Sequence, residues 1–349
     1  MVNLKGSVLI TGANGGLGSA FVANFSKSEY GKEYRGLFTV RNPATAKDLT
    51  TVLEKAPANL KSEVIALDLS SIESIRGVAA DINVRIANGT LEPIRALVLN
   101  AAFQDANSEA LKPKTFTKDG FEMNFGVNYL ANFLFILMIL QSMDKENGRI
   151  VIVQSWTHDT DHPRNNSIAI FSDEEYKMVF TDTETLAKGV TYTDSGYKAG
   201  MRRYGASKTL MMMFHYELQR RLDADPALSN ISVVSMDPAA MGGTGITRTS
   251  PFLIRFLLRN LIPLIQEIAV WFNPNGFMRP PWKSAADLML ASFDEKKLGQ
   301  HPKAVYLDGS ENATPSVEAR DEMKQKKLWD ESLKLARIRD GDTVLKNWQ

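Results

Sequence analysis

The chain of 349 residues contains no cysteine. Disulfide bonds, thiol nucleophiles and cysteine-ligated zinc are therefore excluded. It also lacks any dense run of lysine or arginine, and its formal net charge is only +1. We therefore expect no nucleic-acid partner. No repeat, low-complexity tract or Gly/Ser-rich linker divides the chain, which favours one large domain.

Neither the N-terminal apolar run nor the apolar stretch near residue 260 has the features of a targeting or membrane-spanning segment. The first apolar run, in "MVNLKGSVLITGANGG", is short and leads into glycines, so we expect no signal peptide. The most apolar later stretch, Phe252–Phe272, contains Arg255, Arg259, Glu267 and Pro263, which makes it a poor bilayer span. As a helix it would be amphipathic, and it would either pack over the core and a pocket or touch a membrane surface. We expect a cytoplasmic protein, with peripheral membrane contact as the alternative.

Six short apolar runs rich in Val, Ile and Leu alternate with segments of helical character: "SVLIT", "YRGLFTV", "SEVIALD", "IRALVLN", "GRIVIVQS" and "NISVVSMD". Helix-start chemistry appears at Pro43, which follows Asn42, and in "DLSSIESI" from Asp68. A late run from Lys303, "KAVYLDG", is a candidate seventh strand. Continuously apolar strands that alternate with helices indicate a parallel sheet covered on both faces. The sequence therefore predicts a doubly wound α/β domain.

The stretch "TGANGGLG", from Thr11 to Gly18, follows the first predicted strand and opens the first predicted helix. A dinucleotide pyrophosphate can bind the free backbone N–H groups at such a helix start. Gly12 permits the tight turn, Gly16 lets a cofactor approach the backbone, and Gly18 allows close helix–strand packing. The spacing is G-x-x-x-G-x-G rather than the commoner G-x-G-x-x-G. A glycine-rich turn that binds nothing is the alternative.

Tyr204 and Lys208 are four residues apart in "RYGASK", so on a helix they share one face. Tyr204 is the only one of nine tyrosines with a lysine at that spacing. An ammonium group within about 4 Å would favour the phenolate by up to ~4 kcal/mol at an effective dielectric of about 20. That effect would bring Tyr204 within reach of general acid–base catalysis. The spacing alone does not distinguish such a site from an ordinary helix.

"TGANGGLG" resembles the cofactor loop of the short-chain dehydrogenases/reductases, and further motifs of that family follow in order from about residue 7 to about residue 309. The matching positions are Asp68 and Leu69, Asn100 to Ala102, Asn128, Ser155, Tyr204 and Lys208, and Pro238, Ala239 and Thr244. Ala102 and Ala239 stand where the family has glycine. The chain is similar to carbonyl reductases, to the retinol-dehydrogenase and protochlorophyllide-reductase-like branch, and to fungal ketoreductases of secondary metabolism. The resemblance implies a single Rossmann-like domain.

The resemblance also implies an activity, the NADPH-dependent reduction of a hydrophobic ketone or aldehyde, or the reverse oxidation. Tyr204 would give a proton to the carbonyl oxygen and Ser155 would donate a hydrogen bond to it. Lys208 would hold the nicotinamide ribose and tune Tyr204, and Asn128 would anchor a water molecule. No metal is needed. The cofactor-binding residues implied are Gly12, Asn14, Gly16, Leu17, Gly18, Arg41, Asp68, Leu69, Asn100, Ala101, Ala102, Tyr204, Lys208, Pro238, Ala239 and Thr244.

The end of the second predicted strand bears on the choice of cofactor. An NAD enzyme normally has an acid there, which accepts hydrogen bonds from the ribose hydroxyls. This chain has Arg41 instead and no acid from Gly36 to Lys47. A cation suits a 2′-phosphate, so we predict NADP(H) as the cofactor. The alternative is that Arg41 is simply a solvated residue.

Forty-eight residues separate Ser155 from Tyr204, which we interpret as a helical insertion over residues 156–199 with Ser172 as a helix N-cap. It resembles the extra segment of monomeric carbonyl reductases and so favours a monomer over a homodimer. The apolar run Tyr129–Leu140 fits either deep burial or a subunit interface. We predict an NADP-binding domain over residues 1–312, in which residues 250–280 cap the substrate. Residues 313–349 would then form a charged and exposed helical tail.

Apolar and aromatic side chains are candidates for the substrate pocket. Phe103, Trp156, Tyr197 and Met241 would suit a small hydrophobic carbonyl compound or alcohol. The "WTHDTDHP" segment, which includes His158, is better interpreted as a polar loop at the active-site entrance than as a metal site. The Met-rich run 210–214 should be core.

Arg202 and Arg203 are adjacent, so they cannot both share the helix face of Tyr204, and we expect them at the surface. Two other functions stay open for the chain. One is reduction of a conjugated carbon–carbon double bond. The other is a non-catalytic NADP-binding sensor or scaffold, although such proteins tend to lose the tyrosine or the lysine.

Overall fold

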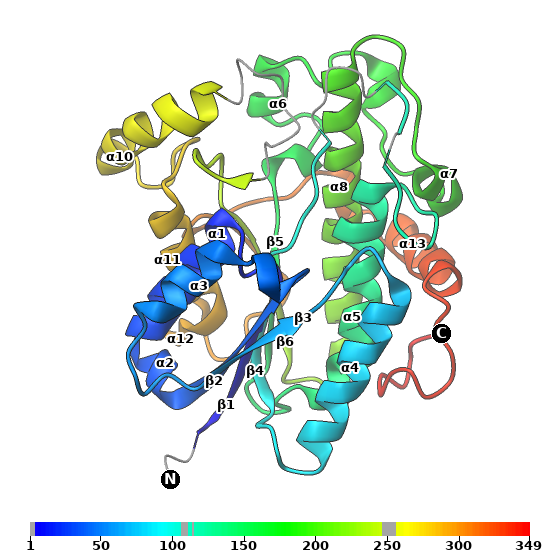
Figure 1. Ribbon diagram of the computed structural model, residues 1–349. Helices are drawn as coiled ribbons and strands as arrows, with labels where there is room; N and C mark the ends of the chain where they lie inside the picture. Colours follow the sequence, from blue (N-terminus) through cyan, green and yellow to red (C-terminus); the bar gives the residue numbers. More distant parts are fainter. Residues whose placement is uncertain (1–3, 106–110, 114, 246–255) are drawn as a thin grey trace.

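The computed structural model describes residues 4–105, 111–113, 115–245 and 256–349, which are built around one eight-stranded sheet (Figure 1). Its strand order is β3-β2-β1-β4-β5-β6-β7-β8. The strands are β1 Gly6–Ile10, β2 Tyr34–Val40, β3 Ser62–Ala66, β4 Ile94–Leu99, β5 Arg149–Val153, β6 Ser232–Asp237, β7 Val305–Asp308 and β8 Glu311–Asn312. The first seven strands are parallel and β8 pairs antiparallel with β7. The predicted doubly wound sheet and its seventh strand are confirmed, and the short β8 was not foreseen.

Helices cover both faces of the sheet, as Figure 1 shows. The helices on one face are α1 Gly16–Lys27, α3 Lys47–Glu54 and α11 Pro281–Phe293, with the short α2 Glu29–Glu33 and α12 Glu295–Leu298 beside them. The helices on the other face are α4 Ile72–Ala87, α5 Ala131–Ile139 and α8 Gly196–Asp223. The central strands β1, β4, β5 and β6 are buried throughout because both of their faces are covered.

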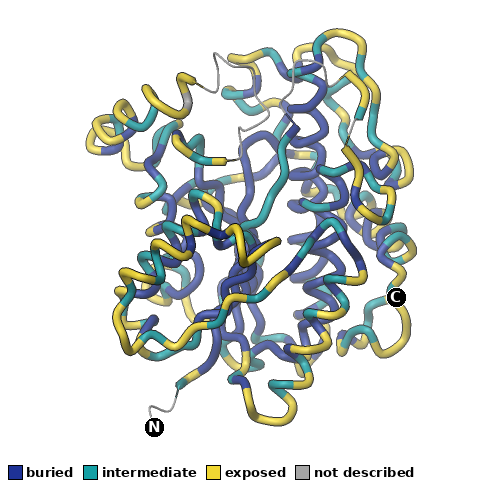
Figure 2. The backbone as a smooth tube through the Cα atoms, in the orientation of Figure 1, coloured by how far each residue is buried: buried dark blue, intermediate teal, exposed yellow. Residues whose placement is uncertain are grey.

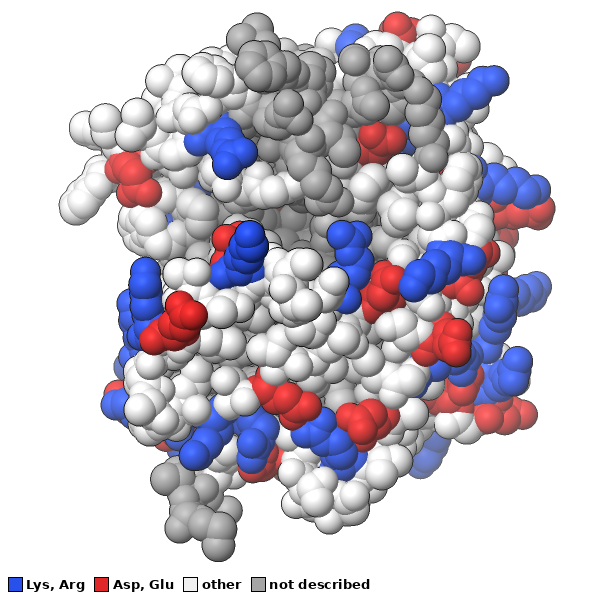
Figure 3. Space-filling model, viewed as in Figure 1, with Lys and Arg blue, Asp and Glu red and all other residues white. Residues whose placement is uncertain are grey.

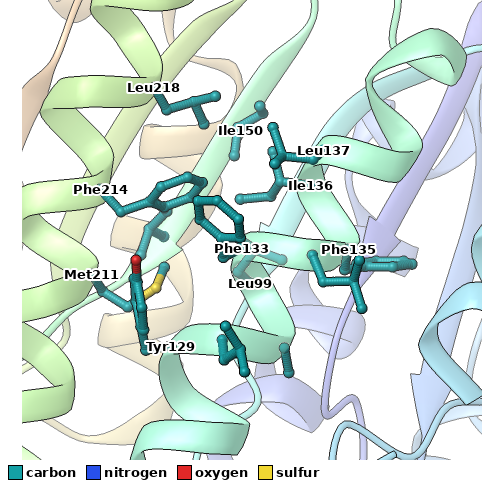
Figure 4. Close-up of a cluster of buried hydrophobic side chains, with 14 of the residues drawn as sticks. Leu99, Tyr129, Phe133, Phe135, Ile136, Leu137, Ile150, Met211, Phe214 and Leu218 are labelled. Atoms are coloured by element: carbon teal, nitrogen blue, oxygen red, sulfur yellow. The ribbon is translucent and has the colours of Figure 1, made fainter. Parts of the chain in front are cut away.

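The largest hydrophobic cluster surrounds α5 (Figure 4). Every residue of α5 is buried, and the ring of Phe133 lies 5.2 Å from the rings of both Phe214 and Trp329. The helical stretch 124–142 is long and apolar enough to cross a membrane, but 89% of its most apolar window is buried inside the molecule. Of the two interpretations left open for this run, the structure shows deep burial. The predicted core position of the Met-rich run is also confirmed.

The C-terminal helix α13, Glu322–Leu335, packs against α8 (Figure 1). Leu328 and Trp329 are each only 1% exposed, so the predicted exposed tail is wrong for the inner face of this helix. The indole Nε1 of Trp329 donates to the main-chain oxygen of Trp348 at 2.7 Å, and the guanidinium of Arg221 lies 4.3 Å from its ring. The many charged residues of this segment suggested an exposed helix, but they lie on its outer side and the opposite side is apolar.

The segment between Ser155 and α8 contains the short helices α6, Pro163–Ser167, and α7, Thr183–Lys188. Ser172 does not cap a helix. The helix cap is instead Asp182, whose Oδ1 accepts a hydrogen bond from the N–H of Thr185 at 2.7 Å.

Arg202 and Arg203 are 1% and 4% exposed, so the surface position expected for them is wrong. The guanidinium of Arg202 forms a two-pronged ion pair with Asp194, at 2.7 and 2.9 Å, and its Nε donates to the main-chain oxygen of Ile170. Arg203 donates to the main-chain oxygen of Val190 at 2.9 Å. Both arginines therefore anchor the inserted segment to α8.

Helix α10, Ile262–Phe272, projects from the body of the molecule, as Figure 2 shows. Trp271 and Phe272 are 84% and 87% exposed, and Figure 3 shows a largely uncharged corner at this helix. Gln266 is buried, and its Oε1 accepts a hydrogen bond from the N–H of Gly242 at 2.9 Å. Most of this helix therefore does not pack over the core. Because residues 250–255 lie outside the described residues, the capping role of the segment stays a prediction.

The buried histidine of α8 gives a stability prediction. His215 is fully buried, its Nδ1 lies 2.9 Å from Ser235 Oγ, and burial lowers its pKa from 6.5 to about 4. The unfolded chain binds the proton first, so this stabilisation is complete above pH 6.5 and is lost as the pH falls towards 4. Relative to His215→Asn, the native protein should lose about 3 kcal/mol over that interval. Urea unfolding at several pH values measures the difference, and a difference independent of pH would contradict the prediction.

Candidate active site

The glycine loop lies between β1 and α1. Gly12 has φ +68°, and α1 begins after Gly15 with no side chain capping its free N–H groups. A Cβ on Gly16 would lie 2.6 Å from Thr244 Cγ2, and one on Gly18 would lie 2.3 Å from the main-chain oxygen of Gly12. The loop thus combines an uncapped helix start with two positions, Gly16 and Gly18, that leave no room for a side chain, as a pyrophosphate site requires.

The end of β4 holds this loop in place. The buried Oγ1 of Thr11 accepts hydrogen bonds from the N–H groups of Asn100 and Ala101, both at 3.0 Å. Asn100 Nδ2 in turn donates to the main-chain oxygens of Thr11 and Gly12 at 2.9 and 3.1 Å. These residues lie where the strand order reverses, between β1 and β4, which is the usual ligand crevice of such sheets.

The residues after β2 lie at the same edge of the sheet. Arg41 is exposed directly after β2. Asn14 Oδ1 accepts a hydrogen bond from the N–H of Leu49 at 3.0 Å, so its side chain ties the loop to α3. Leu17 is buried, at 5% exposure. Of these residues only Arg41 offers a free cation to a ligand.

Asp68 follows β3 and is engaged by two neighbours. Its Oδ1 accepts from the N–H and the hydroxyl of Ser70 at 3.0 and 2.7 Å, and its Oδ2 lies 2.9 Å from Lys118 Nζ. Burial raises the pKa of Asp68, but these hydrogen bonds outweigh burial and hold that pKa below its usual value. Leu69 beside it is buried. Asp68 is therefore held in one orientation. The sequence analysis did not identify Lys118 as its ion-pair partner.

Ser155, Tyr204 and Lys208 meet where β5 ends against α8. The Ser155 hydroxyl lies close enough to the Tyr204 hydroxyl to lower the pKa of Tyr204, and Thr157 Oγ1 donates to Ser155 Oγ at 2.9 Å. Lys208 Nζ donates to the main-chain oxygen of Val153 at 2.8 Å and lies 5.7 Å from the centre of the Tyr204 ring. The structure thus brings together the three residues that the family motifs single out.

The electrostatics of this group differ from our expectation. Burial, followed by the nearby Asp237 carboxylate, raises the pKa of Tyr204 well above its usual value, and the hydrogen bond with Ser155 offsets only part of that rise. Burial lowers the pKa of Lys208 to about 8, against an opposing effect of Asp237. The expectation that Tyr204 titrates within reach of neutral pH is therefore wrong for this structure, because burial of the phenol dominates.

Asn128 joins β4 to α8 rather than contacting Tyr204. Its Oδ1 accepts from the N–H of Phe103 at 2.7 Å, and its Nδ2 donates to the main-chain oxygen of Phe103 at 2.8 Å and to Ser207 Oγ at 2.9 Å. Ser207 Oγ donates onward to the main-chain oxygen of Tyr204 at 2.7 Å. Asn128 lies in a π-helical turn, Asn124–Leu130, a feature that is frequent at functional sites. Its proposed water contact stays a prediction.

The predicted pocket residues are spread along this edge of the molecule. Trp156 follows Ser155, and its ring lies 6.0 Å from that of Phe277. Tyr197 packs with the small cluster around Met201 at the start of α8. The two remaining candidates lie further along the edge: Phe103, partly buried after β4, and Met241, packed against the core beneath α1 and α11. No described cavity joins these four side chains, so their role as pocket walls stays a prediction.

His158 is 2% exposed, so the predicted loop at the active-site entrance is wrong at this residue. Its Nδ1 lies 2.7 Å from the main-chain oxygen of Ser155, and its Nε2 accepts from the N–H of Ser316 at 3.2 Å. The proton is therefore on Nδ1. Burial lowers the pKa of His158 to about 4. His158 thus links the C-terminal segment to Ser155.

Asp237 at the end of β6 also escaped the sequence analysis. It is 1% exposed, and its carboxylate accepts hydrogen bonds from the N–H groups of Trp156 and Ala239 at 2.6 and 2.7 Å. The sequence does contain a signal for it, because Asp237 is an acidic residue at the end of a predicted strand and directly precedes the motif residue Pro238. The flanking motif residues Pro238 and Ala239 lie beside it, and Ala239 has φ +62°.

The residues at this edge fit a dinucleotide. The open start of α1 suits a pyrophosphate, and the space above Gly16 admits no side chain. Gln154, between Val153 and Ser155, is 1% exposed, and neither its amide nitrogen nor its amide oxygen has a hydrogen-bond partner among the described residues. A buried amide without partners is consistent with a polar ligand at this edge.

Comparison with known proteins shows the family of the chain. The family model described as short chain dehydrogenase matches residues 6–166. A short-chain dehydrogenase of Talaromyces variabilis, IccH, is 42% identical over 371 aligned positions that span the whole of both chains. Protochlorophyllide reductase B of Oryza sativa subsp. japonica is 29% identical over 97% of this chain and 79% of its own, and polyprenol dehydrogenase of Mus musculus is 27% identical over 96% and 85%.

Solved structures share the fold at low identity. A short chain dehydrogenase from Burkholderia cenocepacia in complex with NADP has a TM-score of 0.57 and 18% identity, covering 88% of this chain and 97% of its own. The angucycline C-6 ketoreductase LanV with bound NADP has a TM-score of 0.56 and 16% identity, covering 88% and 96%. Fold and site together define a Rossmann-like oxidoreductase. The chain belongs to the short-chain dehydrogenase family.

Proposed function

We propose that this protein uses NADPH to reduce a hydrophobic ketone or aldehyde to the alcohol, or catalyses the reverse oxidation. The observation that carries the proposal is the meeting of Ser155, Tyr204 and Lys208 beside the glycine loop, at the carboxyl edge of the sheet. A sensor or scaffold would have no use for a phenol, a hydroxyl and an ammonium group held together in this way.

The reaction needs a proton at the carbonyl oxygen. Tyr204, a neutral phenol in this structure, donates it, and Ser155 donates a hydrogen bond to the same oxygen. The Lys208 ammonium lies on the same helix face and stabilises the phenolate that remains. Bound cofactor would supply the hydride chemistry, with the glycine loop, Asp68, Asn100 and the 238–244 segment as the residues that hold it.

Arg41 is the residue that we propose selects NADPH over NADH. A charge-assisted hydrogen bond to the 2′-phosphate is lost in Arg41→Ala, so the dissociation constant for NADPH should rise at least about tenfold while that for NADH changes little. Fluorescence titration with each nucleotide measures both constants. Lys27→Ala, an exposed cation at the far end of α1, is the matched control. Equal weakening of both cofactors would show that Arg41 does not contact the phosphate.

The substrate class is tested by turnover. Purified protein, NADPH and a panel of aromatic and aliphatic ketones, aldehydes and conjugated enones should give loss of NADPH absorbance with one of the carbonyl classes. The similarity to protochlorophyllide reductases favours double-bond reduction as the second candidate. Turnover of enones with retention of the carbonyl group would support that candidate. Binding of NADPH without turnover of any compound would support the sensor.

We also propose a monomer, on the basis of what covers α5 and α8. Both helices are already buried by α13 and by the inserted segment, so little of the tyrosine's helix is left for a second subunit. The exposed apolar face of α10, with Trp271 and Phe272, favours peripheral contact with a membrane or with a hydrophobic substrate. A role in secondary metabolism fits the fungal relative, and a cytoplasmic location stays a prediction.

A further inference from the structure

The Asp237 side chain is hydrogen-bonded both to the segment after β5 and to the segment after β6, and the proposed reaction would take place between these two segments. Its Oδ2 accepts from the N–H of Trp156 at 2.6 Å, directly after the catalytic Ser155. Its Oδ1 accepts from the N–H of Ala239 at 2.7 Å, in the segment proposed to contact the cofactor. One buried carboxylate therefore fixes the distance between the end of β5 and the loop that follows β6.

The second of these hydrogen bonds supports a strained backbone. Ala239 has φ +62°, a left-handed conformation that alanine adopts only at a cost. Closing a turn from an aspartate side chain to the N–H two residues later is a recognised way to hold such a conformation. Asp237 thus compensates for the absence of glycine at position 239.

Among the described residues, none forms a direct ion pair with the Asp237 carboxylate. Arg279 donates to the main-chain oxygen of Asp237 at 3.0 Å, not to its carboxylate, and its guanidinium pairs with Asp308, as does that of Arg164 at 3.4 Å. The charged and titratable groups around Asp237 are Tyr204 and Lys208 on α8, Tyr306 and Asp308 on β7, Arg164 on α6, and Arg279 ahead of α11. The carboxylate therefore acts on the catalytic pair through a buried, weakly screening medium.

We propose that Asp237 is a positioning residue that keeps the proton on Tyr204 and the charge on Lys208, so that the proton-donating form is the resting form of the enzyme. This inference rests on the proposed reductase function. Burial, followed by repulsion from Asp308, raises the pKa of Asp237 to about 6. The carboxylate is thus charged above that pH, where it raises the pKa values of both Tyr204 and Lys208.

The test is Asp237→Asn, which removes the charge, keeps the size and retains one of the two acceptors. Removing a negative charge lowers the pKa of Tyr204, so the alkaline limb of kcat/KM for reduction should move to lower pH by about one unit or more. Near pH 5 Asp237 is protonated and carries no charge in the wild type either. The kcat/KM values of the two proteins should therefore converge at that pH. Asp81→Asn, a largely exposed carboxylate on α4, should not move the limb.

A second readout needs neither cofactor nor substrate. Because the folded-state pKa of Asp237 lies above the unfolded value of 3.8, the native protein should gain stability relative to Asp237→Asn as the pH falls from about 6 to 4. Thermal unfolding of both proteins without cofactor measures this gain. This measurement can be made even if the wild type reduces no carbonyl compound. A lack of turnover would count against the proposed function, whereas a stability difference independent of pH would count against the buried charge of Asp237.

Ala239→Gly separates the charge from the turn. If Asp237 only holds the strained turn, the double variant that combines Asp237→Asn with Ala239→Gly should regain full activity with the wild-type pH profile, and the proposal would be overturned. If the charge acts on Tyr204, the double variant keeps the shifted alkaline limb. A uniform loss of kcat with an unmoved limb and a stability difference independent of pH would equally overturn the proposal.

Discussion

Tyr204→Phe should lower kcat for carbonyl reduction by between about 10²-fold and 10⁴-fold while leaving NADPH binding nearly unchanged. The phenyl ring fills the same buried space, so only the proton donor and its hydrogen bond with Ser155 are lost. Steady-state kinetics with the best ketone, together with fluorescence titration of NADPH, measures the two quantities separately.

A matched control is Tyr216→Phe, further along α8 and only partly buried. It should retain wild-type turnover. If Tyr204→Phe kept more than about a tenth of the activity, a loss far smaller than general acid catalysis provides, Tyr204 would not be the proton donor. Equal loss of NADPH affinity and of turnover would instead make Tyr204 a binding residue.

Trp329→Ala should destabilise the folded protein by about 3–5 kcal/mol, the range for removing a large aromatic side chain from a packed core. The indole is 1% exposed, stacks on Phe214 with ring centres 5.8 Å apart and lies edge-on to Phe133. Denaturant unfolding followed by fluorescence measures the change in the free energy of unfolding.

The same helix provides the control for this variant. Met323 is 81% exposed, so Met323→Ala should change stability by less than about 0.5 kcal/mol. A similarly small effect of Trp329→Ala would mean that α13 is an appendage, as the sequence analysis expected. A large effect would make the C-terminal segment part of the same cooperative unit as α8.

The sheet and the meeting of Ser155, Tyr204 and Lys208 could be predicted from the sequence because their signals are local. A buried parallel strand is apolar at every position, and the seven predicted strands are all present. The motif residues Ser155, Tyr204 and Lys208 each follow a strand or lie on one helix face, so strand order alone brings them to the same edge of the sheet.

The features that were missed depend on contacts between distant segments. Nothing near Arg202 in the sequence shows that Asp194 and Ile170 will satisfy its guanidinium, and a charged residue is expected at the surface unless paired. His158 is buried, and two of its contacts, with Ser316 and with the ring of Tyr306, come from residues far along the chain. The raised pKa of Tyr204 depends likewise on its burial and on Asp237, at the end of a different strand.

The packing of Trp329 against Phe133 and Phe214 has a consequence for synthesis of the chain. Helix α5 leaves the ribosome long before the segment that covers it has been translated, and every one of its residues is apolar or buried in the finished protein. Until α13 emerges, the nascent chain must carry an incomplete core whose apolar side chains can associate with other chains. A chain that ends before residue 329 would therefore lack part of the packing around α5 and α8, and we expect it to aggregate more readily than the full chain.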